Sequence, residues 1–284
     1  MNVFFVSNST CYYFTDELMG LLKAAGHEDV TLALVYYSGC PIKRHHQWLL
    51  EGARNYQFRV LDREGLHVYP DYGLLDALSY ADWDVISFDN NARSFASGDA
   101  QIALSEAEPA FGDLYSRIRA LYPNARYLWH EVWANEIGYQ LAFKMETVEQ
   151  RTRVYQAKRC VMEHMVKTYG IEGVPTGDAW EKVRDLELFT TPVAPFADVP
   201  RFSLCTRIVK DAFRDDYTHD GDVGGGQYLN ACVWFEILTG ESCLNNPFRP
   251  VYTCCGREYP LAEEKISLLQ KAAHEAVARW KSTY

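Results

Sequence analysis

The sequence contains no apolar run near the roughly 18 residues that a membrane-spanning helix needs. It also has no sustained basic run, and its formal net charge is −10. Because phosphate groups bind basic surfaces, these features argue against a membrane span and against a nucleic-acid partner. No signal-peptide pattern precedes the first apolar segment, which favours the cytoplasm. A periplasmic or secreted location stays open if a leader has been removed.

Signals for cysteine pairing and metal binding are missing as well. The eight cysteines are scattered without a C-x-x-C pair, so the sequence predicts neither a zinc ribbon nor a small disulfide scaffold. We expect free thiols that are mostly buried. His45 and His46 are adjacent, but no spacing converges on a ligand set, so we expect no metal ion.

What the chain does have is enough apolar sequence for one large core. With 284 residues, 48% of them hydrophobic, we expect a single domain over 1–284. Strand-like runs alternate with segments of helical period, which predicts a mostly parallel five-stranded sheet covered on both faces. We expect a β-hairpin insertion at 56–80 and a C-terminal extension at 241–284. The expected strands lie around 3–6, 30–36, 83–91, 125–133 and 171–174, and the expected helices around 14–25, 111–121 and 147–169.

Polar residues follow three of these strands, at Ser7–Cys11, Ser38–Pro41 and Asp89–Arg93. The carboxyl ends of parallel strands share one edge, where ligands gather, so we expect these three segments to meet there. Ser9 then has two interpretations. It either caps the helix that follows, as Ser, Thr and Asn often do, or it is a nucleophile.

A hydroxyl nucleophile needs a base, and the stretch "FRDDYTHDGDVGGGQYL" offers one. Asp216 and His219 form a D-x-x-H arrangement, in which the carboxylate can orient Nδ1 and leave Nε2 as a general base. Asp215 is a possible substitute for Asp216, whereas Asp220 is expected to be a solvated charge. The glycines at 224–226 lack the Lys-Ser/Thr of a phosphate loop and follow no strand, so we reject that interpretation.

Other residues could bind the substrate or the developing oxyanion. Gly39 and Asn90 are candidate oxyanion donors, although turn geometry accounts for both residue types equally well. Trp133 and Trp180 could wall a substrate pocket, since aromatic rings stack on sugar faces, but most tryptophans are core residues.

Four separated blocks resemble the SGNH, or GDSL-like, hydrolase superfamily. These blocks are V-S-N-S-T at 6–10, Y-S-G-C at 37–40, F-D-N-N at 88–91 and D-x-x-H at 216–219. The longer stretches "VSNSTCYYFTDELMGLLKAAGH", "VPTGDAW" and "GGGQYLNACVWFEILTG" resemble DUF4886, a bacterial SGNH-hydrolase-like family of unknown function. The resemblance covers most of 3–240.

This resemblance implies a flavodoxin-like three-layer α/β/α sandwich and an esterase that needs no metal or organic cofactor. It implies that Ser9 is the nucleophile and an oxyanion donor, with Gly39 and Asn90 as further donors, and that Asp216 and His219 form the catalytic dyad. Asn91 competes with Asn90 or contacts the substrate. A Cys11 nucleophile is conceivable, but Ser9 fits the family position.

Two positions depart from the superfamily pattern, because Ser7 and Phe88 stand where glycine is usual. The expected function is a serine esterase that removes a small acyl group, such as acetyl, from a carbohydrate or glycan. The two departures favour an alternative, a catalytically inactive carbohydrate-binding or scaffold protein. A lipase or thioesterase is a further alternative, and the oligomeric state stays open.

Overall fold

The computed structural model describes residues 1–90, 92–138, 145–190, 203–215 and 219–284. The chain divides into two compact units, each assembled from three segments. Unit 1 comprises Met1–Thr15, Glu28–Val132 and Thr152–Gly173, and unit 2 comprises Asp16–His27, Trp133–Arg151 and Val174–Tyr284. The hairpin predicted at 56–80 lies within unit 1, and the extension predicted at 241–284 lies within unit 2.

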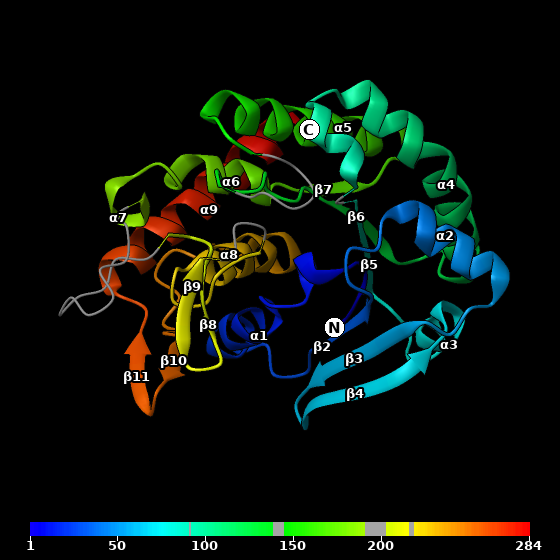
Figure 1. Ribbon diagram of the computed structural model, residues 1–284. Helices are drawn as coiled ribbons and strands as arrows, with labels where there is room; N and C mark the ends of the chain where they lie inside the picture. Colours follow the sequence, from blue (N-terminus) through cyan, green and yellow to red (C-terminus); the bar gives the residue numbers. More distant parts are fainter. Residues whose placement is uncertain (91, 139–144, 191–202, 216–218) are drawn as a thin grey trace. The chain divides into compact units, whose positions relative to one another are not determined.

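The central sheet has seven strands in the order β4-β3-β2-β1-β5-β6-β7 (Figure 1). β1 pairs in parallel with β2 and β5, and β5 pairs in parallel with β6. The sheet is therefore mostly parallel, as predicted, but the predicted hairpin adds two strands, with β3 antiparallel to β2 and to β4. The strands are β1 Asn2–Val6, β2 Thr31–Tyr36, β3 Tyr56–Asp62, β4 Gly65–Tyr72, β5 Val85–Asp89, β6 Arg126–His130 and β7 Glu172–Val174.

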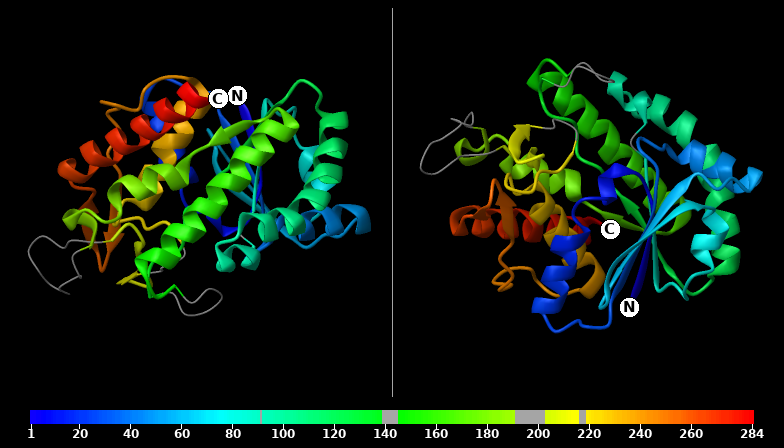
Figure 2. Two further views of the ribbon diagram at one scale, coloured as in Figure 1. Left: turned by 90° about the horizontal axis from the view of Figure 1, so that it is seen from above. Right: turned by 60° about the horizontal axis from the view of Figure 1, so that its bottom comes forward.

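Helices α2 and α4 cover one face of this sheet, and Figure 2 shows both on the same side of the strands. The Phe111 ring of α4 packs edge-on against Phe88 and Trp129, at centroid distances of 5.2 and 5.0 Å. α4 begins earlier than the predicted 111–121, because the Asp99 side chain caps it by accepting the Gln101 N–H at 2.8 Å. The α-helices with residues in unit 1, apart from α1, are α2 Ile42–Glu51, α3 Leu74–Leu78, α4 Ala100–Leu121 and α5 Val148–Tyr169.

Unit 2 is built around α8, whose residues are almost all buried. Helices α6 and α9 pack against it and against each other. Two hairpins that the sequence did not predict, β8–β9 and β10–β11, complete the unit. Among the described helices, none is long and apolar enough to cross a membrane. The elements are α1 Thr15–Ala24, which starts in unit 1, α6 Thr176–Val183, α7 Glu187–Thr190, β8 Thr206–Val209, β9 Ala212–Asp215, α8 Gly226–Thr239, β10 Val251–Cys254, β11 Arg257–Pro260 and α9 Glu263–Thr283.

The glycines before α8 have a packing role. A Cβ on Gly221 would lie 2.1 Å from the Thr206 carbonyl oxygen, and one on Gly224 would lie 2.0 Å from that of Ser203. The close approach allows the Gly221 N–H to donate to the Leu204 carbonyl at 2.8 Å. The glycine run therefore brings two backbone segments together, which accounts for it without a phosphate ligand.

Candidate functional site

The candidate nucleophile lies in a tight turn at the carboxyl end of β1. Asn8 is the cap of a short 3₁₀ helix, Ser9–Cys11, because its Oδ1 accepts the Thr10 N–H at 3.1 Å. The Tyr12 N–H closes the turn on the Ser9 carbonyl at 3.3 Å. Ser9 therefore lies inside the 3₁₀ helix that Asn8 caps, and it does not cap α1, which begins at Thr15.

A buried carboxylate, Asp89 at the end of β5, holds this turn in place. Its oxygens accept hydrogen bonds from the Ser7 hydroxyl, from Asn8 Nδ2 at 2.9 Å and from the Thr10 hydroxyl at 2.9 Å. Burial raises the pKa of Asp89 to about 6, although the hydrogen bonds from Ser7 and Thr10 oppose the shift. Sequence reasoning missed Asp89, yet an acidic residue that closes the apolar strand "VISFD" was a signal for it.

The Ser9 hydroxyl is the one in this turn that has no structural partner. It makes no hydrogen bond, while both neighbouring hydroxyls bind Asp89. The Ser9 residue is only 7% exposed, but its oxygen is not among the enclosed polar atoms. The Ser9 oxygen is therefore not fully enclosed by the described residues.

The two further oxyanion candidates lie on the turns after β2 and β5. Gly39 has φ +61° in a turn closed by a 3.2 Å hydrogen bond from the Cys40 N–H to the Tyr37 carbonyl, so the backbone itself favours glycine here. Asn90 Oδ1 accepts the Ile42 N–H at 3.2 Å, at the start of α2, while Asn90 Nδ2 is enclosed without a hydrogen-bond partner. Asn90 therefore shapes a turn and still carries a spare donor. Asn91 lies outside the described residues.

The two departures from the superfamily pattern do not obstruct the turn. Ser7 donates to Asp89 and has no positive φ, so the side chain adds a hydrogen bond without backbone strain. Side chains alternate along a strand, so Phe88 faces away from Asp89 and packs on Phe111. The features that favoured an inactive protein therefore have structural roles.

Cys11, Asp89 and His130 form a group of metal-ligand type at the turn, with donor atoms within 4.8 Å of one another. Thiolate, carboxylate and imidazole are donors that zinc accepts. However, Cys11 Sγ lies at hydrogen-bond distance from His130 Nδ1, 3.3 Å, and from Asp89 Oδ2, 3.6 Å, and all three residues are buried. Burial also lowers the pKa of His130 to about 3, so the imidazole is neutral. Hydrogen bonding accounts for the group, and Cys11 packs as expected.

The other cysteines agree with the prediction of free thiols. None of the eight forms a disulfide, and only Cys160 and Cys255 are exposed. A second group of metal-ligand type, Asp211, Cys254 and Cys255, joins the two hairpins of unit 2. There the Cys255 N–H donates to Asp211 Oδ1 at 3.2 Å, which again accounts for the contact.

The candidate base belongs to unit 2, whereas Ser9 belongs to unit 1. His219 is half-buried, Asp215 is the last residue of β9, and Asp216 lies outside the described residues. The prediction for Asp220 was wrong, because this carboxylate is fully buried rather than solvated. Its Oδ2 accepts from Asn230 Nδ2 at 3.0 Å, and burial raises its pKa to about 7.

The two candidate substrate-binding tryptophans lie in the core of unit 2. The rings of Trp133 and Trp180 stack at 4.7 Å with an interplanar angle of 7°, and both residues are fully buried. Trp180 Nε1 also donates to Asn230 Oδ1 at 2.7 Å. This arrangement favours the packing interpretation, since neither residue offers an exposed face to a sugar.

A second buried carboxylate of unit 2, Glu17 on α1, should make stability depend on pH. Burial raises the pKa of Glu17 from 4.5 to about 8, and only one of its oxygens has a partner, the Tyr252 hydroxyl at 3.1 Å. Between pH 4.5 and 8 the folded state therefore binds more protons than the unfolded state, so the stability that protonated Glu17 provides is lost as pH rises.

We expect the free energy of unfolding to fall by on the order of 3 kcal/mol from this group between pH 5 and pH 9, and Glu17→Gln to remove that fall. Urea denaturation of both proteins at the two pH values measures the difference. Glu28→Gln, at an exposed glutamate, is the matched control and should keep the wild-type slope. An unchanged slope in Glu17→Gln would show that the carboxyl has an ordinary pKa.

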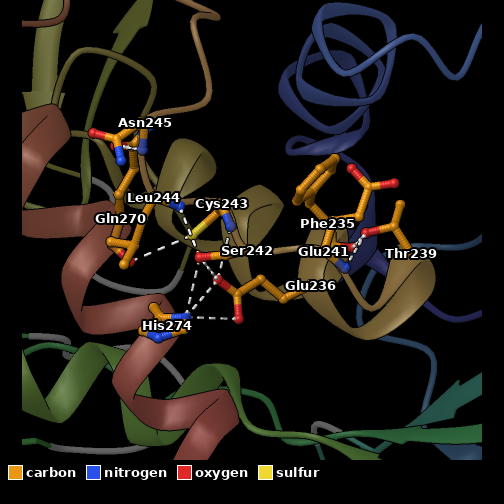
Figure 3. Close-up of polar contacts among 10 residues, drawn as sticks. All are labelled: Phe235, Glu236, Thr239, Glu241, Ser242, Cys243, Leu244, Asn245, Gln270 and His274. Carbon is orange, nitrogen blue, oxygen red and sulfur yellow. Dashed lines mark hydrogen bonds and ion pairs between the residues drawn. The ribbon is translucent and has the colours of Figure 1, made fainter.

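A serine, a histidine and a carboxylate also meet at the end of α8 (Figure 3). Both Glu236 Oε1, at 3.0 Å, and Ser242 Oγ, at 3.3 Å, contact the same nitrogen of His274, Nδ1. A triad needs the carboxylate on one ring nitrogen and the serine on the other. Because Glu236 also accepts the Cys243 N–H at 2.8 Å, the cluster closes the segment after α8 and is not a catalytic triad.

Comparison with known proteins places the chain in a family. DUF4886, described as a domain of unknown function, matches residues 5–188, and no curated protein matches the sequence. A DUF4886 family protein from Bacteroides uniformis has a similar structure, with 21% identity, a TM-score of 0.73 and coverage of 98% of this chain and 95% of that one.

A candidate SGNH hydrolase from Slackia heliotrinireducens is also similar in structure. Its sequence is 13% identical, its TM-score is 0.51, and the match covers 84% of this chain and 98% of that one. This level of identity shows the fold alone, and the fold is that of the SGNH hydrolases, as predicted. Since the DUF4886 match spans more than half of the sequence, the chain belongs to the DUF4886 family.

Proposed function

We propose that this protein is a serine ester hydrolase with Ser9 as its nucleophile. One observation carries the proposal: Asp89 binds the side chains on both sides of Ser9 and leaves the Ser9 hydroxyl alone unbonded at the carboxyl end of β1. A nucleophile must be held rigidly while its own oxygen stays available. The hydrolase-type fold supports the same reaction class.

In the proposed reaction, His219 Nε2 takes the proton of the Ser9 hydroxyl while Oγ attacks the ester carbonyl carbon. Asp216 holds the imidazole in the required tautomer and stabilises its positive charge. The backbone N–H groups of Ser9 and Gly39 and the spare Asn90 Nδ2 bind the oxyanion. The intermediate collapses, His219 protonates the leaving alcohol, and water then hydrolyses the acyl-enzyme with the same base.

The proposed substrate is a small acyl ester, such as the acetyl ester of a carbohydrate or glycan. This choice follows from the resemblance to the superfamily and from no residue of the site. The reaction as written uses only side-chain and backbone groups of the chain.

Replacement of the proposed dyad tests this mechanism. With 4-nitrophenyl acetate as substrate, we expect His219→Gln and Asp216→Asn each to lower kcat by roughly 10²- to 10⁴-fold, since a base and its orienting carboxylate act as a unit. Asp215→Asn is the matched control at the adjacent aspartate and should stay within a few-fold of wild type. The melting temperatures of all three variants, measured in parallel, report on folding. If Asp215→Asn loses the activity and Asp216→Asn keeps it, the orienting carboxylate is Asp215.

A further inference from the structure

An arginine in unit 1, Arg59 on β3, is buried without a counter-ion. It is 9% exposed, and it forms no ion pair and no hydrogen bond. Its Nη1 is enclosed without a partner, whereas Nε and Nη2 are not among the enclosed atoms. An arginine side chain keeps its charge at any physiological pH, so burial without a carboxylate is costly.

The other buried arginines of the described chain are paired. Arg151 donates to Glu136 at 2.8 Å, and Arg184 donates to Glu181 at 2.7 Å. Arg59 therefore departs from the way this molecule otherwise compensates a buried guanidinium. In a chain with a net charge of −10, acidic side chains are not scarce, so an unpaired buried cation calls for another partner.

The position of Arg59 links it to the candidate nucleophile within the same unit. Its guanidinium carbon lies 3.6 Å from the ring centroid of Tyr12, the residue whose N–H closes the turn on Ser9. The Tyr12 ring also packs against the ring of Tyr36, with the two ring centroids 4.6 Å apart. Stacking on Tyr12 fixes the plane of the guanidinium, but a cation–π contact satisfies none of its N–H groups. The Nε and Nη2 pair is the edge of arginine that binds an oxyanion through two parallel hydrogen bonds.

We propose that Arg59 binds a negatively charged group of the substrate, a carboxylate, sulfate or phosphate, while the ester carbonyl lies at Ser9. This inference rests on the proposed esterase function and deepens it, because it assigns the enzyme to acidic esters rather than neutral ones. Arg59 acts as a specificity-determining residue and takes no part in the chemical step. Tyr12 positions it.

Paired substrates test the inference. Mono(4-nitrophenyl) succinate carries a free carboxylate, and its methyl ester is the neutral match with the same leaving group. We expect wild-type kcat/KM to favour the acidic ester, and Arg59→Met, which keeps the apolar stem on Tyr12, to lose roughly 10- to 100-fold on that substrate through KM. Activity on the neutral ester should change less than twofold.

Two further variants separate charge from packing. Arg59→Lys keeps the positive charge but lacks the paired N–H groups of the guanidinium. It should therefore recover part of the preference for the acidic ester. Arg44→Met removes an exposed arginine that also lies over an aromatic ring, Trp48 at 5.7 Å, and should behave like wild type. The inference would be overturned if Arg59→Met lost the same factor in kcat/KM on both esters. It would also be overturned if the wild-type protein showed no preference for the acidic ester.

A binding measurement distinguishes this inference from the esterase proposal. Calorimetric titration with succinate should show binding to wild type and at least a tenfold weaker affinity for Arg59→Met and for Arg59→Gln. If neither ester is hydrolysed, the esterase proposal fails while succinate binding still reports on Arg59. If wild type binds no succinate, or the variants bind it equally well, the anion subsite is rejected whatever the activity.

Discussion

Ser9→Ala should abolish ester hydrolysis and labelling by a fluorophosphonate without unfolding the protein. Removal of a serine nucleophile typically costs several orders of magnitude in kcat, and we expect at least a 10³-fold loss here. Because the Ser9 hydroxyl makes no hydrogen bond, its removal should change the free energy of unfolding by less than about 1 kcal/mol. Intact-mass spectrometry measures the adduct: one label on wild type and none on the variant.

Thr10→Ala is the matched control for this experiment. The Thr10 hydroxyl binds Asp89 at 2.9 Å, so its loss leaves a buried carboxylate oxygen with one donor fewer and should cost about 1–3 kcal/mol of stability. The label on Ser9 should remain. The two substitutions thus have opposite signatures, one in chemistry and one in stability. A folded wild-type protein that takes no label, or a Ser9→Ala variant that still takes it, contradicts the assignment of Ser9.

Gly224→Ala is expected to be strongly destabilising for a change that adds a single methyl group to unit 2. The new Cβ would lie 2.0 Å from the Ser203 carbonyl oxygen, a backbone atom that cannot rotate away. The segment 203–206 must therefore move away from Gly224. This movement breaks the 3.0 Å hydrogen bond from the Gly224 N–H to the Thr206 carbonyl. We expect a loss of more than about 3 kcal/mol, which lowers the melting temperature by about 10 °C.

Gly240→Ala provides the comparison for Gly224→Ala. Gly240 ends α8 with φ +75°, and nothing lies within 4 Å of a Cβ built on it. This variant should lose only about 1 kcal/mol, the cost of a left-handed alanine. Because Gly224 lies only a few residues after His219 in sequence, Gly224→Ala should also lower activity, whereas Gly240→Ala should not. Similar melting temperatures for the two variants would refute the steric argument.

Local sequence patterns were sufficient for the parallel part of the fold. The runs that form β1, β2, β5 and β6 are apolar and short, and the polar residues that end them mark the carboxyl edge of the sheet. A hairpin insertion was also predicted at 56–80, and β3 and β4 lie within it, but its place in the sheet was not predicted. Pairing between β2 and β3 depends on contacts between distant segments, which periodicity does not encode.

The candidate site was likewise predicted only in part from the sequence. The sequence by itself determined that Ser9 follows a buried strand in a turn of hydroxyl and amide residues, and a helix cap was a real competitor for its role. The tertiary structure showed that Asn8 caps the short 3₁₀ helix and that the carboxylate holding the turn, Asp89, comes from a strand 80 residues away from Ser9 in sequence. The role of Ser9 as a nucleophile stays a prediction.

Burial was the property that the sequence determined least. Asp220 stands in a polar stretch and was predicted to be solvated, yet it is fully buried and bound to Asn230. Arg59 gave no signal at all among alternating strand residues. The charge of such a residue is written in the sequence, but its desolvation and its partners are set by whatever other segments pack around it, and only the tertiary structure decides those.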